Sequence, residues 1–399
     1  MKILLLSTNN FSGAGIATKK IYETLKRNNI DCDFKFLINA QDNSLNSKLK
    51  INLLKLKLKI NKFICILFGK KIKEFQSLSL FPTNLAKEIN KSKYDIIHLT
   101  WINEFLSIKD IGNIKKPIVW TLCDMWPIGG VSHYDINKAN STFSLKSENN
   151  NILDKWIIKK KINLWKNKIH FVAPSKWLLN SCKKSIVSKK FSHSLIPWPI
   201  NQNIYKKRDK NKLREKYKIP KNVKIALFNS FSGIYNKRKG WDLLKEAITK
   251  TKTNFELIII GNGKNFIIEK QINKKIYWMG VIKDEDKLAE IINCADIFLL
   301  PSRMDNLPQS GLEAQSCGLP IVTFNCNGLK DLVDHKTNGY LARPYDTNSF
   351  ARGIDWAFFK ISSNKFFFKS VLKKAKNWDS NLIYKSYLKL YSEILHNKN

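Results

Sequence analysis

Two carboxylates stand eight positions apart in one apolar segment of this 399-residue chain: Asp305 and Glu313, within "PSRMDNLPQSGLEAQSCGLPIVTF". No basic residue lies between Arg303 and Lys330, so Glu313 is poorly explained as a surface acid that balances nearby lysines. A carboxylate among apolar neighbours is costly to bury unless donors hydrogen-bond to it. The pair therefore predicts a site whose ligand carries hydroxyl groups.

The same segment predicts the elements that position these acids. "ADIFLLPS" is typical of a buried strand and "RMDN" of a loop. Proline is tolerated in a first helical turn, so Pro308 predicts a helix that begins near Leu307. Gly318 should end that helix. Glu313 then lies in mid-helix, whereas Asp305 lies in the loop, close to the free N–H groups of the helix start.

Three consecutive cations, Lys237, Arg238 and Lys239, stand in "FNSFSGIYNKRKGWDLL", where a loop opens into a helix. Cations beside a helix N-terminus are unfavourable for the helix alone. An anionic ligand would relieve this conflict. In so basic a protein, however, a solvated loop cluster is an alternative that the sequence leaves open.

A glycine pair, Gly13 and Gly15, follows the first apolar run in "NNFSGAGIA". Glycines allow the backbone to approach a ligand closely, and the N-terminus of the following helix would favour a phosphate. An ordinary tight turn is the commoner explanation of such a pair. Thr18 stands where a dinucleotide fingerprint has its third glycine, and no suitable acid follows the next strand, so a nicotinamide dehydrogenase is a poor fit.

Short apolar runs alternate with helical material along the chain, first "KILLLSTN" to "IHFVAPS" and then "VKIALFN" to "PIVTFN". Runs of this kind indicate parallel sheets covered on both faces. The Pro-rich "SLIPWPINQNIY" breaks the pattern near residue 200. We expect domains at 1–200 and 201–375, with 376–399 as a C-terminal helix that crosses back to the N-terminal domain. Two such domains bind ligands in the cleft between them, at the carboxyl ends of the strands.

Composition narrows the function classes further. The formal charge of +38 indicates an anionic partner, although the joint over-use of Lys, Ile and Asn points to coding bias as well. No nucleic-acid-binding motif is present, so no nucleic acid is expected as a partner. Seven cysteines without a Cys-x-x-Cys pair favour a reduced, cytosolic compartment over disulfides or zinc. No apolar run approaches the roughly 18 residues of a spanning helix, and "MKILLLS" is too short for a secretory signal.

One segment, residues 48–73, has nine lysines and no acid until Glu74: "KLKINLLKLKLKINKFICILFGKKIK". Its apolar period lies between that of a strand and that of a helix, so both remain open. The segment is either a solvated surface element with one side on the core or a basic amphipathic patch that rests on an anionic membrane.

The motifs together resemble those of retaining glycosyltransferases of family 4, which have the GT-B fold. Asp305-x7-Glu313 with "EAQSCGLPIVTFNCNGLKDLVDHKTNGYLARPYD" is similar to the Glu-x7-Glu region of that family. "NKRKGWDLLKEA", "YWMGVIKDEDKLAEIINCADIFLLPSR" and "SGAG" are similar too. "DIIHLTWINEFLS", "KPIVWTLCDMWPIGGVSHYD" and "FVAPSKWLLNSCKKS" resemble the branch that acts in surface polysaccharide and lipopolysaccharide assembly.

The resemblance implies two Rossmann-like, doubly wound domains that face each other across a cleft, with the acceptor on the N-terminal domain and a nucleotide-sugar donor on the C-terminal one. Glu313 would bind the ribose, and Asp305 the hydroxyls of the donor sugar. Asn306 and Leu307, with Pro308, would form the loop around that sugar.

The resemblance also implies that the basic loop and the glycine loop bind the diphosphate. The resemblance implies that Lys239 neutralises it, with Gly15 contributing from the N-terminal domain; Arg238 and Gly13 complete the predicted donor-binding set. The charge on the leaving group would be stabilised by lysine and helix N-termini, so we expect no metal and no other cofactor.

Departures from the family pattern bear on the predicted catalytic residues Asp124, His133 and Asp305. Cys123 stands where the family often has histidine, and a packed small residue is its simplest interpretation. Asp124 and His133 then become the polar groups expected near the reacting centre, although a structural loop histidine is an equal alternative for His133. The arginine usually found six positions before the phosphate-binding lysine is replaced by Gly233, and Arg238 is the residue available to compensate.

The sequence thus predicts transfer of a sugar to a glycan or lipid-linked acceptor, by a cytoplasmic enzyme that is peripheral on the inner face of the cytoplasmic membrane. A non-catalytic binding or scaffold protein of the same fold is the alternative prompted by Cys123 and Gly233. A nucleotide-sugar epimerase of this fold is a second alternative, although it is not expected to carry "TLCDMW".

Overall fold

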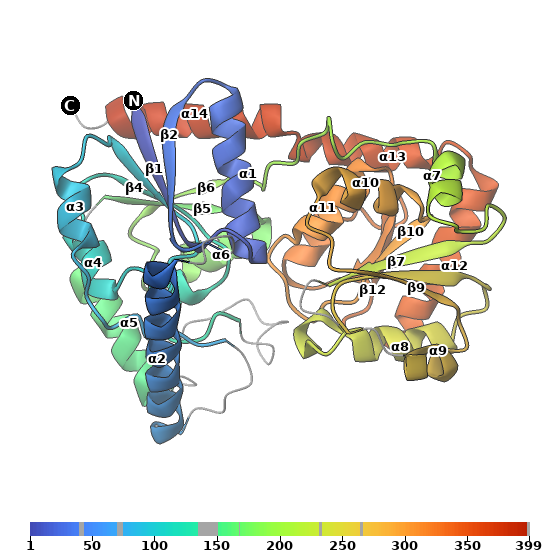
Figure 1. Ribbon diagram of the computed structural model, residues 1–399, viewed down its shortest axis with the longest axis horizontal. Helices are drawn as coiled ribbons and strands as arrows, with labels where there is room; N and C mark the ends of the chain where they lie inside the picture. Colours follow the sequence, from blue (N-terminus) through green and yellow to red (C-terminus); the bar gives the residue numbers. More distant parts are fainter. Residues whose placement is uncertain are drawn as a thin grey trace. The chain divides into compact units, whose positions relative to one another are not determined.

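In the computed structural model the chain forms two compact units, Met1–Pro199 with Asn381–Asn399, and Ile200–Ser380 (Figure 1). The structure describes residues 1–39, 44–69, 75–134, 151–166, 168–230, 234–263 and 266–396. Each unit is an α/β unit, built on a sheet of six strands. The two units are called unit 1 and unit 2 below.

Unit 1 contains a parallel sheet in the order β2-β1-β3-β4-β5-β6. The side chains of β3 and β4 are buried along their whole length, as expected for central strands with helices on both faces. The N-terminal apolar run is a strand, as predicted. The bounds are Lys2–Asn9 (β1), Asp31–Ile38 (β2), Ile96–Leu99 (β3), Ile118–Thr121 (β4), Ile169–Ala173 (β5) and Ser192–Leu195 (β6).

The helices of unit 1 include the basic segment, which forms α2 from Leu45 to Leu67. This settles the choice between strand and helix for its described part; residues 70–73 lie outside the described residues. The other helices are Gly13–Arg27 (α1), Leu85–Lys91 (α3), Ile108–Asn113 (α4), Ile152–Leu164 (α5) and Lys176–Lys184 (α6), with a short 3-10 helix at Trp126–Ile128 (η1).

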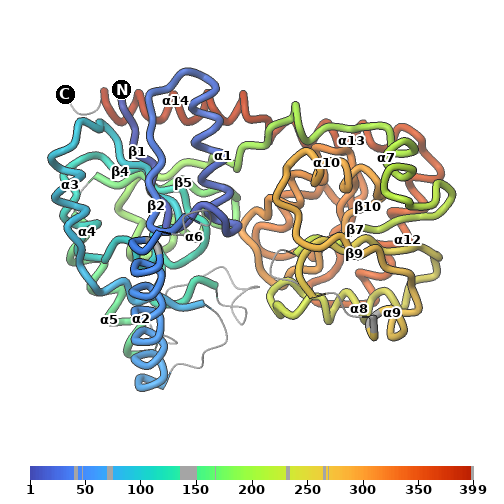
Figure 2. The backbone as a smooth tube through the Cα atoms, in the orientation of Figure 1, coloured from blue at the N-terminus to red at the C-terminus, as the bar shows by residue number. Residues whose placement is uncertain are grey.

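The helix α14, Ser380–His396, belongs to unit 1 from Asn381 onwards although it follows unit 2 in the sequence (Figure 2). Its Tyr391 hydroxyl lies 2.7 Å from Nδ1 of His98 in β3. Its Tyr387 hydroxyl lies 2.9 Å from Oγ1 of Thr121 in β4. All four side chains are fully or almost fully buried, so α14 is part of the core of unit 1.

Unit 2 contains a parallel sheet in the order β12-β11-β10-β7-β8-β9. Counted from β7, this is the strand order 3-2-1-4-5-6 of a doubly wound nucleotide-binding sheet. The bounds are Ile225–Asn229 (β7), Glu256–Ile260 (β8), Ile276–Gly280 (β9), Ile297–Leu300 (β10), Ile321–Phe324 (β11) and Gly339–Ala342 (β12).

The helix of the paired acids, α11, spans Gln309–Ser316. It begins two residues later than predicted, because Pro308 has an extended ψ of 124° and serves as the N-cap. The other helices of unit 2 are Lys210–Lys216 (α7), Trp241–Thr249 (α8), Phe266–Ile272 (α9), Glu285–Asn293 (α10), Thr347–Ser363 (α12) and Phe367–Ala375 (α13), with 3-10 helices at Lys237–Lys239 (η4), Asn327–Asp331 (η5) and Lys376–Trp378 (η6).

Each sheet has a point at which its strand order reverses: between β1 and β3 in unit 1, and between β7 and β10 in unit 2. The loops that leave the two strands at such a point diverge, which opens a crevice at the carboxyl edge of the sheet. The fold therefore places the loops after β7 and β10 beside each other. These loops carry the predicted basic residues and Asp305.

Candidate functional site

The basic loop and the Asp305 loop of unit 2 are joined through their backbones. The amide of Arg303 donates to the carbonyl of Arg238 at 2.8 Å. Gly240 follows η4 with φ of 73°, and a Cβ there would lie 2.0 Å from the carbonyl oxygen of Pro301. A side chain at this position would force the loops apart, so the glycine permits the close approach.

Asp305 lies between two cations. Its Oδ1 accepts from Nη1 of Arg238 at 2.6 Å, and its Oδ2 accepts from Nζ of Lys239 at 2.8 Å. Only 8% of the Asp305 side chain is exposed. Burial alone would raise the pKa of this carboxyl, but Arg238 and Lys239 together lower it to about 2. The three residues form a charged cluster, with Asp305 buried and the two cations partly exposed, at the point where the strand order reverses.

The loop that carries Asp305, Asn306 and Leu307 is held in place by hydrogen bonds to η5. The Asp305 amide donates to Oδ1 of Asn327 at 3.2 Å, and the Gly328 amide donates to the Asp305 carbonyl at 3.2 Å. A Cβ on Gly328 would lie only 1.3 Å from the carbonyl oxygen of Asn306. The sequence reasoning missed these two supports, although the "NG" pair at 327–328 is a turn signal that could have drawn attention to them.

Glu313 is 5% exposed on α11, so the mid-helix carboxylate is buried as predicted. Burial raises the pKa of Cys317, one turn along the same helix, to about 12, and the charge of Glu313 contributes to that rise. Burial also raises the pKa of the Tyr205 phenol, again with a contribution from Glu313.

The two glycines of the unit 1 pair differ in the space that a side chain would have at their positions. The amide of Gly15 donates to the Ser12 side chain at 3.2 Å, which caps α1. A Cβ at Gly15 would lie 2.3 Å from the Asn9 carbonyl oxygen, so packing alone requires glycine there. A Cβ at Gly13 would meet nothing within 4 Å. The tight-turn interpretation therefore accounts for Gly15, and a role of Gly13 or Gly15 in phosphate binding stays a prediction.

Asp124 and His133 lie together at the carboxyl edge of the unit 1 sheet. Asp124 Oδ2 is 2.5 Å from His133 Nδ1 and accepts from Nε1 of Trp101 at 3.1 Å. Nε2 of His133 lies 3.0 Å from Nδ2 of Asn103 and 3.1 Å from Oγ of Ser77. Both nitrogens of the ring thus have partners within the protein, which favours the structural alternative for His133.

The Ser77, His133 and Asp124 side chains stand in the order of a nucleophilic triad. Ser77 is fully buried, however, and His133 is only 2% exposed. A serine nucleophile must reach the substrate, so this network serves to hold the loop rather than to attack a ligand.

Cys123 is half-buried beside this network. Burial raises the pKa of its thiol well above the ordinary value, and the charge of Asp124 adds to the rise. The thiol is therefore neutral at physiological pH, as expected for a packed small residue rather than a nucleophile.

The loop that leads to His133 rests on a lysine that the sequence reasoning missed. Lys161 of α5 is fully buried, and its ammonium donates to the carbonyls of Trp126, Gly129 and Gly130, the latter two at 2.9 and 3.2 Å. The same ammonium lies 3.9 Å from the centre of the Trp126 ring. Burial lowers the pKa of Lys161, while Asp124 and Asp154 oppose the shift.

Replacing Lys161 with methionine should lower the free energy of unfolding by about 3 kcal/mol, because three buried carbonyl groups would lose their donor. Urea unfolding at neutral pH would measure this. Lys160→Met is the matched control, since the ammonium of Lys160 lies over the outward-facing Trp156 ring at 5.2 Å. Equal losses in the two variants would contradict the anchoring role of Lys161.

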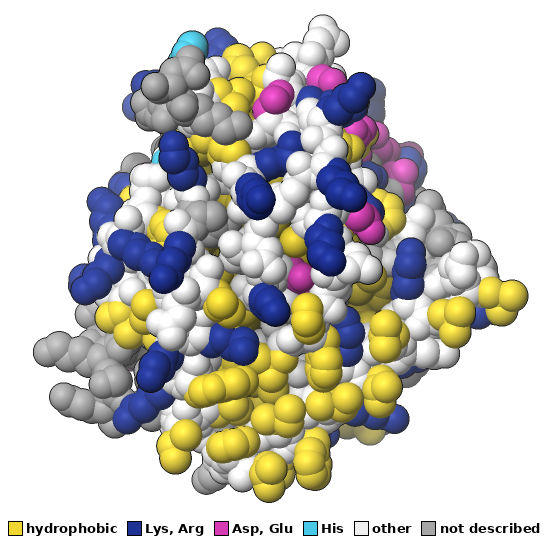
Figure 3. Space-filling model, turned by 90° about the vertical axis from the view of Figure 1, so that its left-hand side faces the viewer, with side chains coloured by type: hydrophobic (Ala, Val, Ile, Leu, Met, Phe, Trp, Pro, Cys, Tyr) yellow, Lys and Arg dark blue, Asp and Glu magenta, His cyan; other side chains and the backbone are white. Residues whose placement is uncertain are grey.

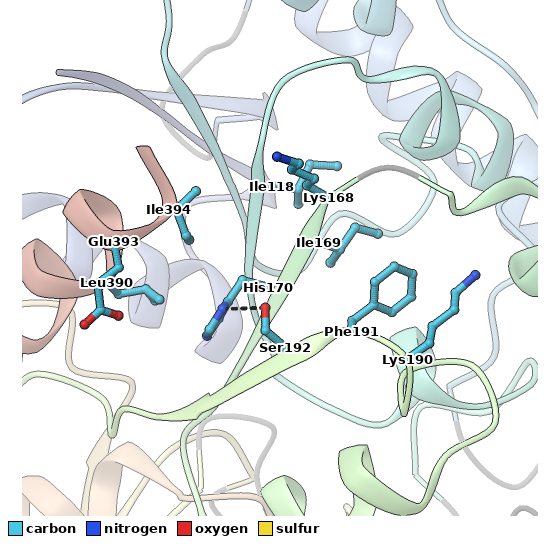
Figure 4. A pocket seen from close by; sticks show the side chains of 10 residues that line it. All are labelled: Ile118, Lys168, Ile169, His170, Lys190, Phe191, Ser192, Leu390, Glu393 and Ile394. Atoms are coloured by element: carbon cyan, nitrogen blue, oxygen red, sulfur yellow. Dashed lines mark hydrogen bonds between the residues drawn. The ribbon is translucent and has the colours of Figure 1, made fainter. Parts of the chain in front are cut away.

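A separate pocket of about 490 Å³ lies at the opposite edge of the unit 1 sheet (Figure 4). It is formed where β4, β5 and β6 begin, and residues of α14 contribute to its wall. His170 and Ser192 in this wall are hydrogen-bonded at 2.8 Å. Ligands of doubly wound sheets bind at the carboxyl ends of the strands, so this pocket is not part of the candidate site.

The structure thus brings most predicted residues into two groups. Unit 2 joins Asp305 to Arg238 and Lys239, with Asn306 and Leu307 buried in the same loop and Glu313 buried on the helix that follows. Unit 1 joins Asp124 to His133. Gly233 lies outside the described residues. Across the described ranges, no group of three or more His, Cys, Asp or Glu side chains is arranged to hold a metal ion.

Comparisons with known proteins fit this arrangement. Residues 209–377 match the family model described as glycosyl transferases group 1. A curated relative, the N,N'-diacetylbacillosaminyl-diphospho-undecaprenol alpha-1,3-N-acetylgalactosaminyltransferase of Campylobacter jejuni, is 26% identical over 40% of this chain and 43% of its own. The chain spans between 40% and 49% of the length of the first curated relatives it matches.

Two solved structures are similar over nearly the whole chain. Sucrose-phosphate synthase from Thermosynechococcus elongatus has a TM-score of 0.71 at 15% identity, covering 100% of both chains. Anabaena HepE in complex with UDP and glucose has a TM-score of 0.62 at 15% identity, covering 98% of this chain and 100% of its own. Residues 209–377 therefore match the glycosyl transferases group 1 family, in a chain whose two doubly wound units have the GT-B fold.

Proposed function

We propose that this protein is a glycosyltransferase that moves a sugar from a nucleotide-sugar donor, with retention, to a glycan or lipid-linked acceptor in cell-surface polysaccharide synthesis. The observation that carries the proposal is the partly buried cluster of Asp305, Arg238 and Lys239 at the reversal point of the unit 2 sheet. Clusters at this position meet the ligands of doubly wound sheets, and the cluster belongs to the part that matches the family.

In the proposed donor complex, each group of the nucleotide sugar has a chemically matched partner. Lys239 and Arg238 carry the charge that a diphosphate requires. Glu313 is a buried acceptor for the two ribose hydroxyls, and Asp305 is an acceptor for hydroxyls of the sugar. The leaving group gains negative charge during transfer, and preorganised cations stabilise that charge without reorganisation. We therefore expect no requirement for a metal cofactor.

Unit 1 is the proposed acceptor side. The Asp124–His133 pair fixes the loop that follows β4, and the part of this network that remains half-exposed is Trp101. A ring of this kind is suited to packing against a sugar face. Asp124 and His133 would then act by shaping the loop, with Asp124 as the charged group closest to an acceptor.

The direct test is a thermal-shift screen of uridine, guanosine and adenosine diphosphates and their sugar conjugates, followed by an assay of donor hydrolysis without acceptor. A transferase should be stabilised by one base series and should slowly release that nucleoside diphosphate. Binding without any hydrolysis or transfer would favour the scaffold alternative, and interconversion of two nucleotide sugars would favour the epimerase. Stabilisation by no nucleotide would overturn the proposal.

We also propose that the protein rests on an anionic membrane surface through helix α2. Leu45, Leu49, Leu56, Phe63 and Leu67 are 53% to 80% exposed, and at 3.6 residues per turn they share one side of the helix. Asn61 and Cys65, on the opposite side, are buried. The stripe of five therefore points away from the core of unit 1.

Lysines flank this stripe, and α5 extends it. Asn151, which caps α5, donates to the carbonyl of Phe68 just after α2. The exposed Ile152 and Trp156 follow on α5. The view in Figure 3 shows a broad apolar area on this side of the molecule, bordered by basic side chains. A second copy of the same surface would bring lysines against lysines, whereas an anionic bilayer accepts both the apolar stripe and its charged border.

Replacing Lys48, Lys55, Lys59 and Lys62 with glutamine should weaken binding to phosphatidylglycerol-containing vesicles about a thousandfold, since each of the four lysines near an anionic surface contributes about 1 kcal/mol. Lys57 is left unchanged because it donates to the Glu104 carbonyl. Cosedimentation would measure the loss. The control removes four exposed lysines of unit 2, Lys365, Lys369, Lys373 and Lys376. Equal weakening in both variants, or equal binding to neutral vesicles, would contradict a specific surface on α2.

No helix in the described parts of the chain is long and apolar enough to cross a bilayer.

A further inference from the structure

The two cations proposed to hold the donor diphosphate are already bridged by an anion of the protein itself. Asp305 uses one oxygen for Arg238, at 2.6 Å, and the other for Lys239, at 2.8 Å. Side-chain exposure is 18% for Arg238 and 19% for Lys239, so solvent screens these pairs only partly. A diphosphate that binds these cations must share them with the carboxylate or displace it.

Asp305 cannot move far from the cations. Its backbone is held on both sides of the peptide by Asn327 and Gly328. The Arg238 guanidinium also donates to the Met304 carbonyl at 2.9 Å, and the Arg238 carbonyl accepts from the Arg303 amide. A side-chain rotation can release the carboxylate from the cations, but the released group stays beside the diphosphate.

We propose that Asp305 is an internal competitor of the diphosphate that makes the site prefer an intact nucleotide sugar to the free nucleoside diphosphate. This inference rests on the proposed function. A nucleotide sugar can compensate the displaced carboxylate, because sugar hydroxyls donate hydrogen bonds to it. A free nucleoside diphosphate has no such donor, and its terminal phosphate carries one more negative charge into the same place. Like charges brought together in a poorly solvated site are costly.

The ionisation of Asp305 fits this role. Burial opposes the charged form, but Arg238 and Lys239 outweigh it and hold the pKa of the carboxyl at about 2. The repulsion is therefore present throughout the physiological pH range. The product of transfer, a free nucleoside diphosphate, would be expelled by the same group that binds the sugar of the substrate.

The experiment compares the wild type with Asp305→Asn by isothermal titration, using UDP, GDP and ADP and their glucose conjugates. The ratio of the dissociation constant for the diphosphate to that for the matching nucleotide sugar should fall at least about tenfold in the variant, because the repulsion is lost only from the free diphosphate. Asp305→Glu keeps the charge and should keep the preference. Asp242→Asn is the matched control, since it removes a carboxylate from the neighbouring pair with Arg303, and its ratio should equal that of the wild type.

Other outcomes separate this inference from the function on which it rests. Nucleotide binding with an unchanged ratio in Asp305→Asn would overturn the competition and leave the glycosyltransferase proposal intact. Binding of no nucleotide by the wild type would overturn both. If Asp305→Asn does not fold, the affinities of the wild type alone test the competition. At least one nucleotide sugar should then bind more tightly than the matching nucleoside diphosphate. Tighter binding of the diphosphate in every pair would overturn the competition.

Discussion

Replacing Lys239 with alanine should weaken the binding of a nucleoside diphosphate by about a hundredfold while the affinity for the matching nucleoside stays nearly unchanged. The Lys239 ammonium is proposed to bind the diphosphate, and a hydrogen bond between charged groups contributes about 1.5–3 kcal/mol. The variant also removes one of the two cations that pair with Asp305 and leaves the pair with Arg238, which increases the repulsion that a diphosphate meets.

Titration of UDP and uridine, or of the base series identified by thermal shift, would measure the effect of Lys239→Ala. Lys237→Ala is the matched control, because Lys237 lies in the same 3-10 helix and is exposed. It should retain nearly the full affinity for the diphosphate. If nucleoside and diphosphate lose affinity equally in Lys239→Ala, the residue does not bind phosphate.

Replacing Glu313 with glutamine should lower the affinity for a nucleotide sugar by about a hundredfold and reduce turnover at low donor concentration in proportion. The buried carboxylate is proposed to accept two ribose hydroxyl groups, and the amide of glutamine offers one neutral acceptor in their place. Glutamine preserves the volume of the side chain, so the packing of α11 is disturbed less than by alanine.

Ribose recognition by Glu313 is tested most sharply with 2′,3′-dideoxy nucleotides. The wild type should discriminate strongly against them, whereas Glu313→Gln should bind the ribo and dideoxy forms almost equally. Glu246→Gln, which changes an acid on α8 whose side chain is 54% exposed, should discriminate as the wild type does. Retention of the discrimination by Glu313→Gln would show that the carboxylate does not contact the ribose.

Much of the fold follows from the sequence because it depends on local pattern. Unbroken apolar runs such as "IFLL" of β10 predict buried parallel strands, and all four residues of β10 are buried. The burial of Glu313 was predictable as well, since its helix carries no other charge. The start of that helix was placed two residues too early, because an N-cap proline and a first-turn proline look alike in sequence.

The pairing of Asp305 with Arg238 and Lys239 could not be read from the sequence. The partners are 66 and 67 residues away and meet only because β7 and β10 are neighbours in the sheet. The sequence placed Asp305 beside helix N–H groups instead. Lys161 was missed for a different reason: in a chain with 70 basic residues, one more lysine on a helix looks like a surface residue.

The docking of α14 onto unit 1 has a consequence for biosynthesis. His98 and Thr121 are made early, but their partners Tyr391 and Tyr387 leave the ribosome some 270 to 290 residues later. The first unit therefore cannot complete its core until the second unit has been synthesised. Nascent chains of this protein expose an unfinished hydrophobic surface for most of the time that translation takes.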